Sequence, residues 1–235
     1  MCNLYQMTPK NDLAVYVRKH LPELFLPDFD SSRPVGPFGA GLFLRNIDSV
    51  MAGTVGQWGL IRPKSPAPKP GDKRYNTNNA RIESIAEKPT YRYAWKAGQR
   101  CLIPAAWYAE PNWETGKNIW WHLKRADGFP WFLAGLWDEW TNPDTGEIVP
   151  NYTMITRNCD DHPMLARLHK PDPKLPPDQQ DKRSLVHVSP ENWQQWLAGS
   201  EDEARSLLRL PPEEVFDQAD RLKTDALLSG PDGLF

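Results

Sequence analysis

Four segments rich in β-branched and aromatic residues lie in the middle of the chain and are joined by short turns. One of these turns is Ala126-Asp127-Gly128. Segments of this composition favour strands, and turns this short favour antiparallel neighbours. The sequence therefore predicts an antiparallel meander as the centre of the fold. The four segments are 102–108, 119–123, 131–137 and 152–156.

The flanking sequence adds two strands and several short helices. Residues 41–45 and 50–61 are strand-like, and Thr8-Pro9 followed by apolar residues at helical spacing predicts a helix over 9–20. Further helices are expected through Met164 and Leu168, from Ser189-Pro190 through Leu197, and after the capping box Ser200-x-x-Glu203. Loops are expected at 22–38, 62–75 and 171–181, and a loosely attached tail over about the last 20 residues.

These elements predict an α+β protein in which an antiparallel-rich sheet is surrounded by peripheral helices. The 235 residues suit one domain, 1–235. There is no apolar run of about 20 residues and no basic-then-apolar leader, so we expect a cytoplasmic protein. Three cysteines without paired spacing predict a reduced protein with no metal and no cofactor. A monomer is the default expectation.

Charge is distributed unevenly along the chain. Between residues 61 and 100 there are 10 Lys and Arg against 3 acids, whereas from 189 to the end there are 4 against 10. A basic centre beside an acidic tail is typical of a phosphate-facing surface, although a solvated loop beside a solvated helix would give the same counts. Some of the 11 tryptophans could stack on unpaired bases, and most should be core.

Cys2 follows the initiator methionine directly. Aminopeptidases remove the initiator before a small residue, which would leave Cys2 with a free α-amine beside its thiol. Their ordinary pKa values, about 8 and about 8.5, leave both partly nucleophilic at neutral pH. Such an aminothiol condenses with an aldehyde to an imine, and the thiol then closes a thiazolidine ring. A chance cysteine is the alternative.

Three other places carry groups suited to chemistry. Asn79 and Arg81 could orient a nucleophile and hold a phosphate, or Asn79 could be a helix cap and Arg81–Glu83 an ordinary surface pair. Glu110 ends an apolar run among aromatic residues, which would raise its pKa for proton transfer, unless it is a hydrated strand end. His169 precedes a proline-rich loop and is less easily explained by a helix or strand face than the other histidines, although a single histidine is more often structural.

Together these residues resemble the SRAP (SOS-response-associated peptidase) family. The resemblance extends from Cys2 to about Trp196 and depends on several motifs in order. They are Met-Cys-x-x-Tyr at the start, Trp-Gly-Leu-Ile at 58–61, Asn-Ala-Arg-x-Glu at 79–83, Arg-Cys-Leu-Ile-Pro-Ala at 100–105 with Glu110 nine residues after the Cys, Ala-Gly-Leu-Trp-Asp at 134–138, and the late His169.

The resemblance implies a half-open β-barrel with a basic cleft for single-stranded DNA, and capture of abasic sites in that DNA. Cys2 would form the thiazolidine crosslink once Met1 is removed, Asn79 would orient the new N-terminus, and Arg81 would bind a phosphate. Glu110 would move protons, and His169 would assist ring opening and reversal. Lys170, Trp58 and Arg45 complete the expected DNA contacts.

Two departures from the family pattern stand out, and two alternative functions share the same residues. After His169 the family has an Arg-Met-Pro sequence, whereas this chain has Lys170-Pro171-Asp172, so the expected DNA contact passes to Lys170. The residues around Glu110 also differ from the family's Asp-Gly-Phe-Tyr-Glu-Trp. A thiol peptidase or autopeptidase would use Cys2 as nucleophile, His169 as base and Glu110 to orient that base. A single-stranded DNA-binding module would not react at all.

Overall fold

A computed structural model describes residues 2–47, 50–69 and 76–229. Met1, residues 70–75 of the expected proline-rich loop and residues 230–235 of the expected loose tail lie outside this range. In the described part, no helix is both long enough and apolar enough to cross a membrane.

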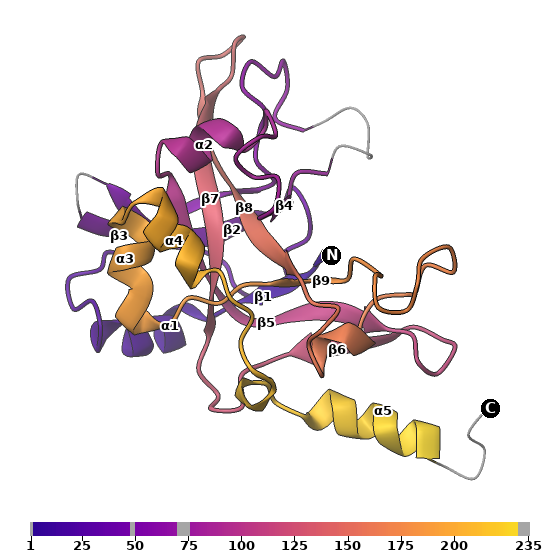
Figure 1. The fold of residues 1–235 in the computed structure, drawn as a ribbon. Helices are drawn as coiled ribbons and strands as arrows, with labels where there is room; N and C mark the ends of the chain where they lie inside the picture. The colour runs from indigo at the N-terminus through magenta and orange to yellow at the C-terminus, as the bar shows by residue number, and fades with distance from the viewer. Residues whose placement is uncertain (1, 48–49, 70–75, 230–235) are drawn as a thin grey trace.

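Nine strands in the described residues form one sheet, drawn as arrows in Figure 1. All six strands expected from the sequence are present, most of them longer than expected. The strands are β1 Tyr5–Met7, β2 Ala40–Ile47, β3 Val50–Trp58, β4 Asn79–Arg81, β5 Arg100–Asn112, β6 Ile119–Leu123, β7 Trp131–Thr141, β8 Ile148–Asn158 and β9 Arg183–Leu185.

Five of these strands close into a barrel in the order β5, β2, β3, β8, β7 and back to β5. The closure is uneven. β2 joins β5 at the single pair Leu44–Leu102, and β3 joins β8 only at Gln57–Asn151 and Trp58–Tyr152. Most pairs are antiparallel, but β3–β8 and β4–β8 are parallel. The expected half-open, mostly antiparallel barrel is confirmed.

Large aromatic side chains fill the barrel. Tyr5, Trp58 and Tyr152 are fully buried, and the hydroxyls of Tyr5 and Tyr152 lie 2.5 Å apart. Gly41 lies directly beneath this hydroxyl pair, where any Cβ would collide with both oxygens. The narrow interior is therefore filled by side chains, as is usual for a small barrel, and the polar site lies at its margin.

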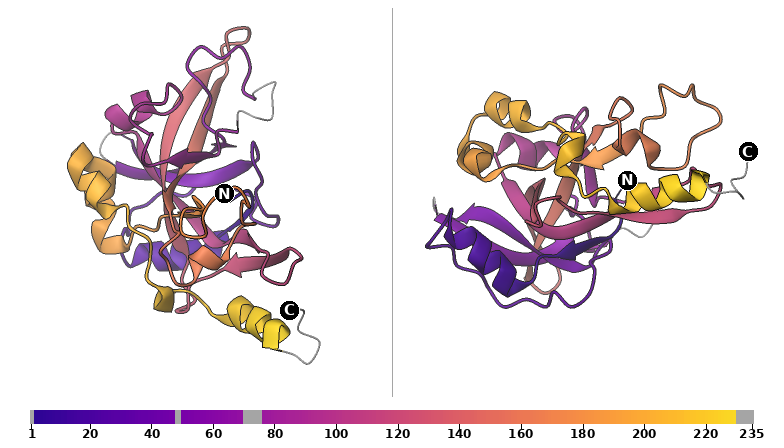
Figure 2. Two further views of the ribbon diagram at one scale, coloured as in Figure 1. Left: turned by 45° about the vertical axis from the view of Figure 1, so that its right-hand side comes forward. Right: turned by 90° about the horizontal axis from the view of Figure 1, so that it is seen from below.

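The helices lie around the barrel, as the sequence predicted. Figure 1 shows α1, α3 and α4 together on one side and α5 beyond β6 on another. The second view of Figure 2 separates α1 from α3 and α4. The helices are α1 Lys10–Arg18, α2 Arg92–Lys96, α3 Trp193–Ala198, α4 Glu201–Leu207 and α5 Ala219–Ser229, with single 3₁₀ turns η1 Leu165–Arg167, η2 Pro190–Asn192 and η3 Glu213–Val215.

Two predictions for the C-terminal part of the chain have different outcomes. The capping box is present, since the Ser200 side chain accepts from the Glu203 backbone N–H and Glu203 reaches back to the Ser200 N–H. The expectation of a loose tail does not describe residues 219–229. Thr224 of α5 is fully buried and its hydroxyl accepts a 2.9 Å hydrogen bond from the Trp121 indole, so α5 docks on β6.

Candidate functional site

Cys2 is placed beside β5 by the strand that follows it. β1 pairs with β5 at Tyr5–Tyr108, and the Ala109 N–H donates to the Leu4 carbonyl at 2.9 Å. The side chain of Cys2 is fully buried, and its Sγ lies 3.3 Å from the Leu4 carbonyl oxygen. Burial raises the pKa of the Cys2 thiol well above its usual value. At neutral pH the sulfur therefore carries its proton.

Two adjacent asparagines hold the backbone of Cys2. The Nδ2 groups of Asn78 and Asn79 both donate to the Cys2 carbonyl, at 3.1 and 2.6 Å. Asn79 begins β4, which is fixed by its parallel pairing with β8. Asn78 is held through its own carbonyl, which accepts from the Trp58 indole N–H at 2.9 Å. Asn79, which was expected to orient the N-terminus, thus contacts the Cys2 backbone directly, and so does Asn78.

Glu110 belongs to the buried end of β5, one residue beyond the Ala109 contact. Its side chain is fully buried. Removal from water disfavours the carboxylate and raises the pKa of Glu110 to about 8. The acid is therefore mostly protonated at neutral pH, which is the condition in which a carboxyl group can donate a proton.

His169 is brought to Glu110 by a short antiparallel contact with the end of β5. Its backbone N–H donates to the Pro111 carbonyl at 2.6 Å, and its backbone is left-handed with φ 64°. Its Nε2 lies 2.8 Å from the Arg183 carbonyl and 3.6 Å from Glu110 Oε2. A carbonyl accepts only, so Nε2 carries the proton.

His169 and Glu110 are not a charged pair at neutral pH. Burial lowers the pKa of His169 to about 4 while it raises that of Glu110 to about 8, so both groups are mainly uncharged near pH 7. The 3.6 Å separation is also longer than a hydrogen bond. The site therefore holds a neutral imidazole and a protonated acid beside Cys2.

Arg81 lies at the outer edge of this site, where β4 ends. Its guanidinium is about half exposed and pairs with Asp181 at 2.7 Å. Asp181 also accepts from Arg183 at 2.8 Å, and Arg183 contacts Glu83. The exposed guanidinium could exchange this carboxylate for a phosphate. Lys170 directly follows His169 in the chain. Its Nζ lies 5.0 Å from the Trp113 ring centre and makes a cation–π contact with that ring.

Trp58 and Arg45 do not fit the DNA contacts predicted for them. Trp58 is fully buried and so cannot stack on a base; its indole supports Asn78 instead. The Arg45 side chain is only 10% exposed and pairs with Glu139 at 2.7 Å. It also lies 4.1 Å from the Trp137 ring centre. Arg45 therefore belongs to the packed margin of the barrel.

The sequence interpretation missed three members of the site, Asn78, Asp181 and Arg183. Asn78 had a readable signal, because it precedes Asn79 and shares its chemistry. Asp181 and Arg183 had none, because charged residues at the end of a proline-rich loop read as a solvated surface. In the structure Arg183 is buried, and its carbonyl orients His169.

Fold and site together define an α+β barrel protein centred on a buried cysteine near its N-terminus, flanked by a protonated acid and a neutral histidine. The family model described as SOS response associated peptidase (SRAP) matches residues 1–223. The chain therefore belongs to the SRAP family.

Similar proteins agree with this assignment. Abasic site processing protein HMCES of Xenopus tropicalis is 30% identical over 117 residues, 43% of this chain and 35% of that protein. Abasic site processing protein YoqW of Bacillus subtilis is 28% identical over 130 residues, 55% of each chain. The matches thus span only about a third and about half of those relatives. A crystal structure of a protein from Bordetella bronchiseptica aligns with a TM-score of 0.76 at 30% identity, covering 92% of this chain and 97% of that one.

Proposed function

We propose that this protein processes abasic sites in single-stranded DNA by forming a thiazolidine crosslink through Cys2, after hydrolysis has removed Met1. The observation that carries the proposal is the fixed Cys2 backbone, with two asparagine amides on its carbonyl, beside an acid whose pKa is about 8. The relatives named for abasic site processing support the choice of substrate.

The first step joins the free amine of Cys2 to the ring-opened sugar aldehyde. The amine adds to the carbonyl carbon and gives a neutral carbinolamine. Glu110 then protonates the hydroxyl, water leaves, and an iminium ion and the Glu110 carboxylate remain. A protonated acid is needed at this point, and burial supplies one at neutral pH.

The second step closes the ring without any further reagent. The Cys2 thiol gives its proton to the Glu110 carboxylate, and sulfur adds to the iminium carbon. The product is an uncharged thiazolidine and Glu110 is protonated again, so protons and charge balance. A thiol kept protonated by burial does not compete with the amine for the aldehyde in the first step.

His169 and Arg81 act around this exchange. The Nε2 proton of His169 is held by the Arg183 carbonyl, which leaves Nδ1 as an acceptor for the sugar hydroxyl released on ring opening. Arg81 binds a phosphate next to the lesion. The substrate is single-stranded because a paired strand would obstruct the approach of a backbone sugar to a buried residue.

The test uses protein whose N-terminus has been verified as Cys2 by mass spectrometry, mixed with single-stranded DNA that contains one abasic site. We expect a heat-stable adduct on a denaturing gel. Cys2→Ser is the informative control, because its amine can form an imine but its hydroxyl forms a far less stable ring. That variant should give an adduct only after borohydride reduction.

Two results would contradict the proposal. One is the absence of any adduct with the processed wild-type protein, which would leave non-covalent DNA binding. The other is a heat-stable adduct of wild-type yield with Cys2→Ala. Cleavage of an added peptide that depends on Cys2 would instead support the peptidase alternative.

A further inference from the structure

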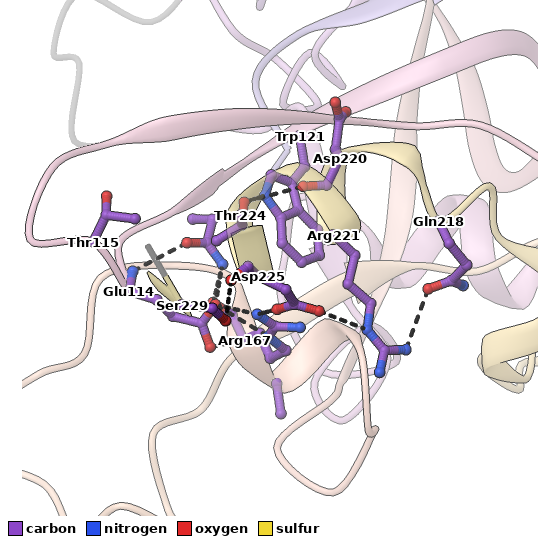
Figure 3. Close-up of polar contacts among 12 residues, drawn as sticks. Glu114, Thr115, Trp121, Arg167, Gln218, Asp220, Arg221, Thr224, Asp225 and Ser229 are labelled. Carbon is purple, nitrogen blue, oxygen red and sulfur yellow. Dashed lines mark hydrogen bonds and ion pairs between the residues drawn. The ribbon is translucent and has the colours of Figure 1, made fainter. Parts of the chain in front are cut away.

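Arg167, two residues before His169, is held between carboxylates from two different parts of the chain. Its Nε and terminal nitrogen contact Glu114 at 2.9 and 2.7 Å, and the terminal nitrogen contacts Asp225 of α5 at 2.5 Å. Figure 3 shows the guanidinium between the two acids. Its side chain is 19% exposed and lies over the Trp121 ring. Fork-like contacts of this kind fix direction as well as position.

The position of Asp225 is fixed by the docking of α5 on β6. The Trp121 indole donates to the buried Thr224 hydroxyl at 2.9 Å, and the His122 backbone N–H donates to Asp220 at 2.7 Å. Figure 3 shows Trp121 beside Thr224 of the helix. Thr224 precedes Asp225 directly, so the docked helix delivers the carboxylate to Arg167. Thr224 and Asp225 lie beyond the segment matched by the family model, which ends at residue 223.

Arg167 is linked to His169 through a short stretch of backbone that is pinned on both sides. The Arg167 carbonyl accepts from the buried Asn112 amide at 3.1 Å, and Leu168 forms a bridge with Asn112. The His169 N–H then donates to Pro111 at 2.6 Å. A left-handed backbone at a residue other than glycine persists only where its surroundings hold it.

We propose that Arg167 is a positioning residue for His169, and that α5 is part of the site because Asp225 holds Arg167 against Glu114. The contacts form one continuous path from α5, through the Arg167 side chain and the backbone of 167–169, to the imidazole beside Glu110. The proposal rests on the proposed function in one respect only, that His169 takes part in the reaction.

A DNA-free measurement tests the positioning directly. The imidazole of His169 is followed by NMR titration and assigned with a His169→Gln spectrum. In the wild type its pKa should be about 4, because burial excludes water. In Asp225→Asn and Arg167→Gln the 167–169 segment should loosen, water should reach the ring, and the pKa should rise toward its ordinary value of about 6.5.

Crosslinking rates give the second readout. We expect Asp225→Asn to slow adduct formation about threefold at saturating DNA, as for loss of a partly exposed ion pair. Arg167→Gln should slow it about tenfold, because misplacement of a reacting group is costly. Arg167→Lys should fall between wild type and Arg167→Gln, since lysine keeps the charge without the fork geometry. DNA affinity should not change.

Lys223→Gln is the matched control, because this charge on α5 contacts only Asp220 of the same helix among the contacts of the described residues. It should behave as wild type in both measurements. If Arg167→Gln does not fold, Asp225→Asn and Glu114→Gln answer the same question from outside the 167–169 segment.

The two proposals fail in different ways. If folded variants of Arg167 and Asp225 crosslink at the wild-type rate and leave the His169 titration unchanged, the positioning role is refuted while the proposed function stands. If processed wild-type protein gives no adduct, the proposed function fails, and the titration alone decides the positioning role.

Discussion

Replacing the buried acid by its neutral isostere, Glu110→Gln, should stabilise the fold above neutral pH while it slows the chemistry. Glu110 is fully buried, and burial raises its pKa from the ordinary 4.5 to about 8. In the unfolded chain the same carboxyl ionises freely. Glutamine has nearly the same shape and never ionises, so it removes this difference between the two states.

The sign and size of the effect follow from proton linkage. Between pH 4.5 and about 8 the unfolded chain has released this proton and the folded chain keeps it, so the wild-type free energy of unfolding falls as pH rises. At about 1.4 kcal/mol per pH unit, the range corresponds to an upper limit of about 5 kcal/mol. Relaxation around the charged group would reduce it to about 2–4 kcal/mol.

His169 contributes with the opposite sign. Its pKa is lowered to about 4 from the ordinary 6.5, so the unfolded chain binds a proton that the folded chain does not. The stability it supports is complete above pH 6.5 and is lost as pH falls toward 4. This dependence is common to wild type and Glu110→Gln, so it largely cancels in their difference.

The assay is urea unfolding, followed by tryptophan fluorescence at pH 5, 6, 7, 8 and 9 for both proteins with the same verified N-terminus. The free-energy difference in favour of Glu110→Gln should grow from pH 5 to pH 8 and then level off. Adduct formation by Glu110→Gln should be slower by about 100-fold, the order expected for loss of a general acid. A free-energy difference that does not change with pH would refute the argument for a raised Glu110 pKa.

Three further predictions follow from contacts at and around the site. Asn79→Ala removes the 2.6 Å hydrogen bond to the Cys2 carbonyl and should slow adduct formation about tenfold in single-turnover gel assays, with unchanged DNA affinity. Arg81→Gln should weaken DNA binding and reduce the steepness of the plot of log binding constant against log salt concentration by about 1. Asp181→Asn removes the carboxylate that pairs with Arg81 and should strengthen binding. Fluorescence anisotropy measures both effects. Gly41→Ala should lower the free energy of unfolding by about 2 kcal/mol or more in urea titrations, because its Cβ would collide with the Tyr5 and Tyr152 hydroxyls.

The sequence predicted the barrel strands because their signal is local. Aromatic and β-branched residues crowd β5, β6, β7 and β8, and their turns are short. Three short strands, β1, β4 and β9, escaped prediction. β4 reads Asn-Ala-Arg and β9 reads Arg-Ser-Leu, compositions that favour no strand by themselves. β4 and β9 pair with β8, and β1 pairs with β5, so each strand depends on a partner that is distant in the sequence and lies outside a local window.

The site could be predicted in part for a similar reason. Cys2, Asn79, Glu110 and His169 were predicted as site residues from the sequence, and the structure brings all four together at the end of β5. Trp58 and Arg45 were misassigned because their residue types suit DNA equally well when exposed, and burial depends on packing that spacing does not encode. The docking of α5 was missed because it depends on a buried threonine and an ion pair rather than on an apolar stripe.

The two shortest strand pairings of the barrel, β2–β5 and β3–β8, have a consequence for local opening. The hairpin of β2 and β3 joins the rest through one register pair on one side and two on the other, whereas β5, β7 and β8 share long ladders. Amide protons of the hairpin should therefore exchange with solvent as a separate, earlier unit. Glu110 lies on the slowly exchanging part, but the indole that supports Asn78 belongs to the end of β3. Each opening of the hairpin would remove the indole that supports Asn78 and leave the acid in place, while the Met154 N–H of β8 keeps its 3.0 Å hydrogen bond to the Asn78 carbonyl.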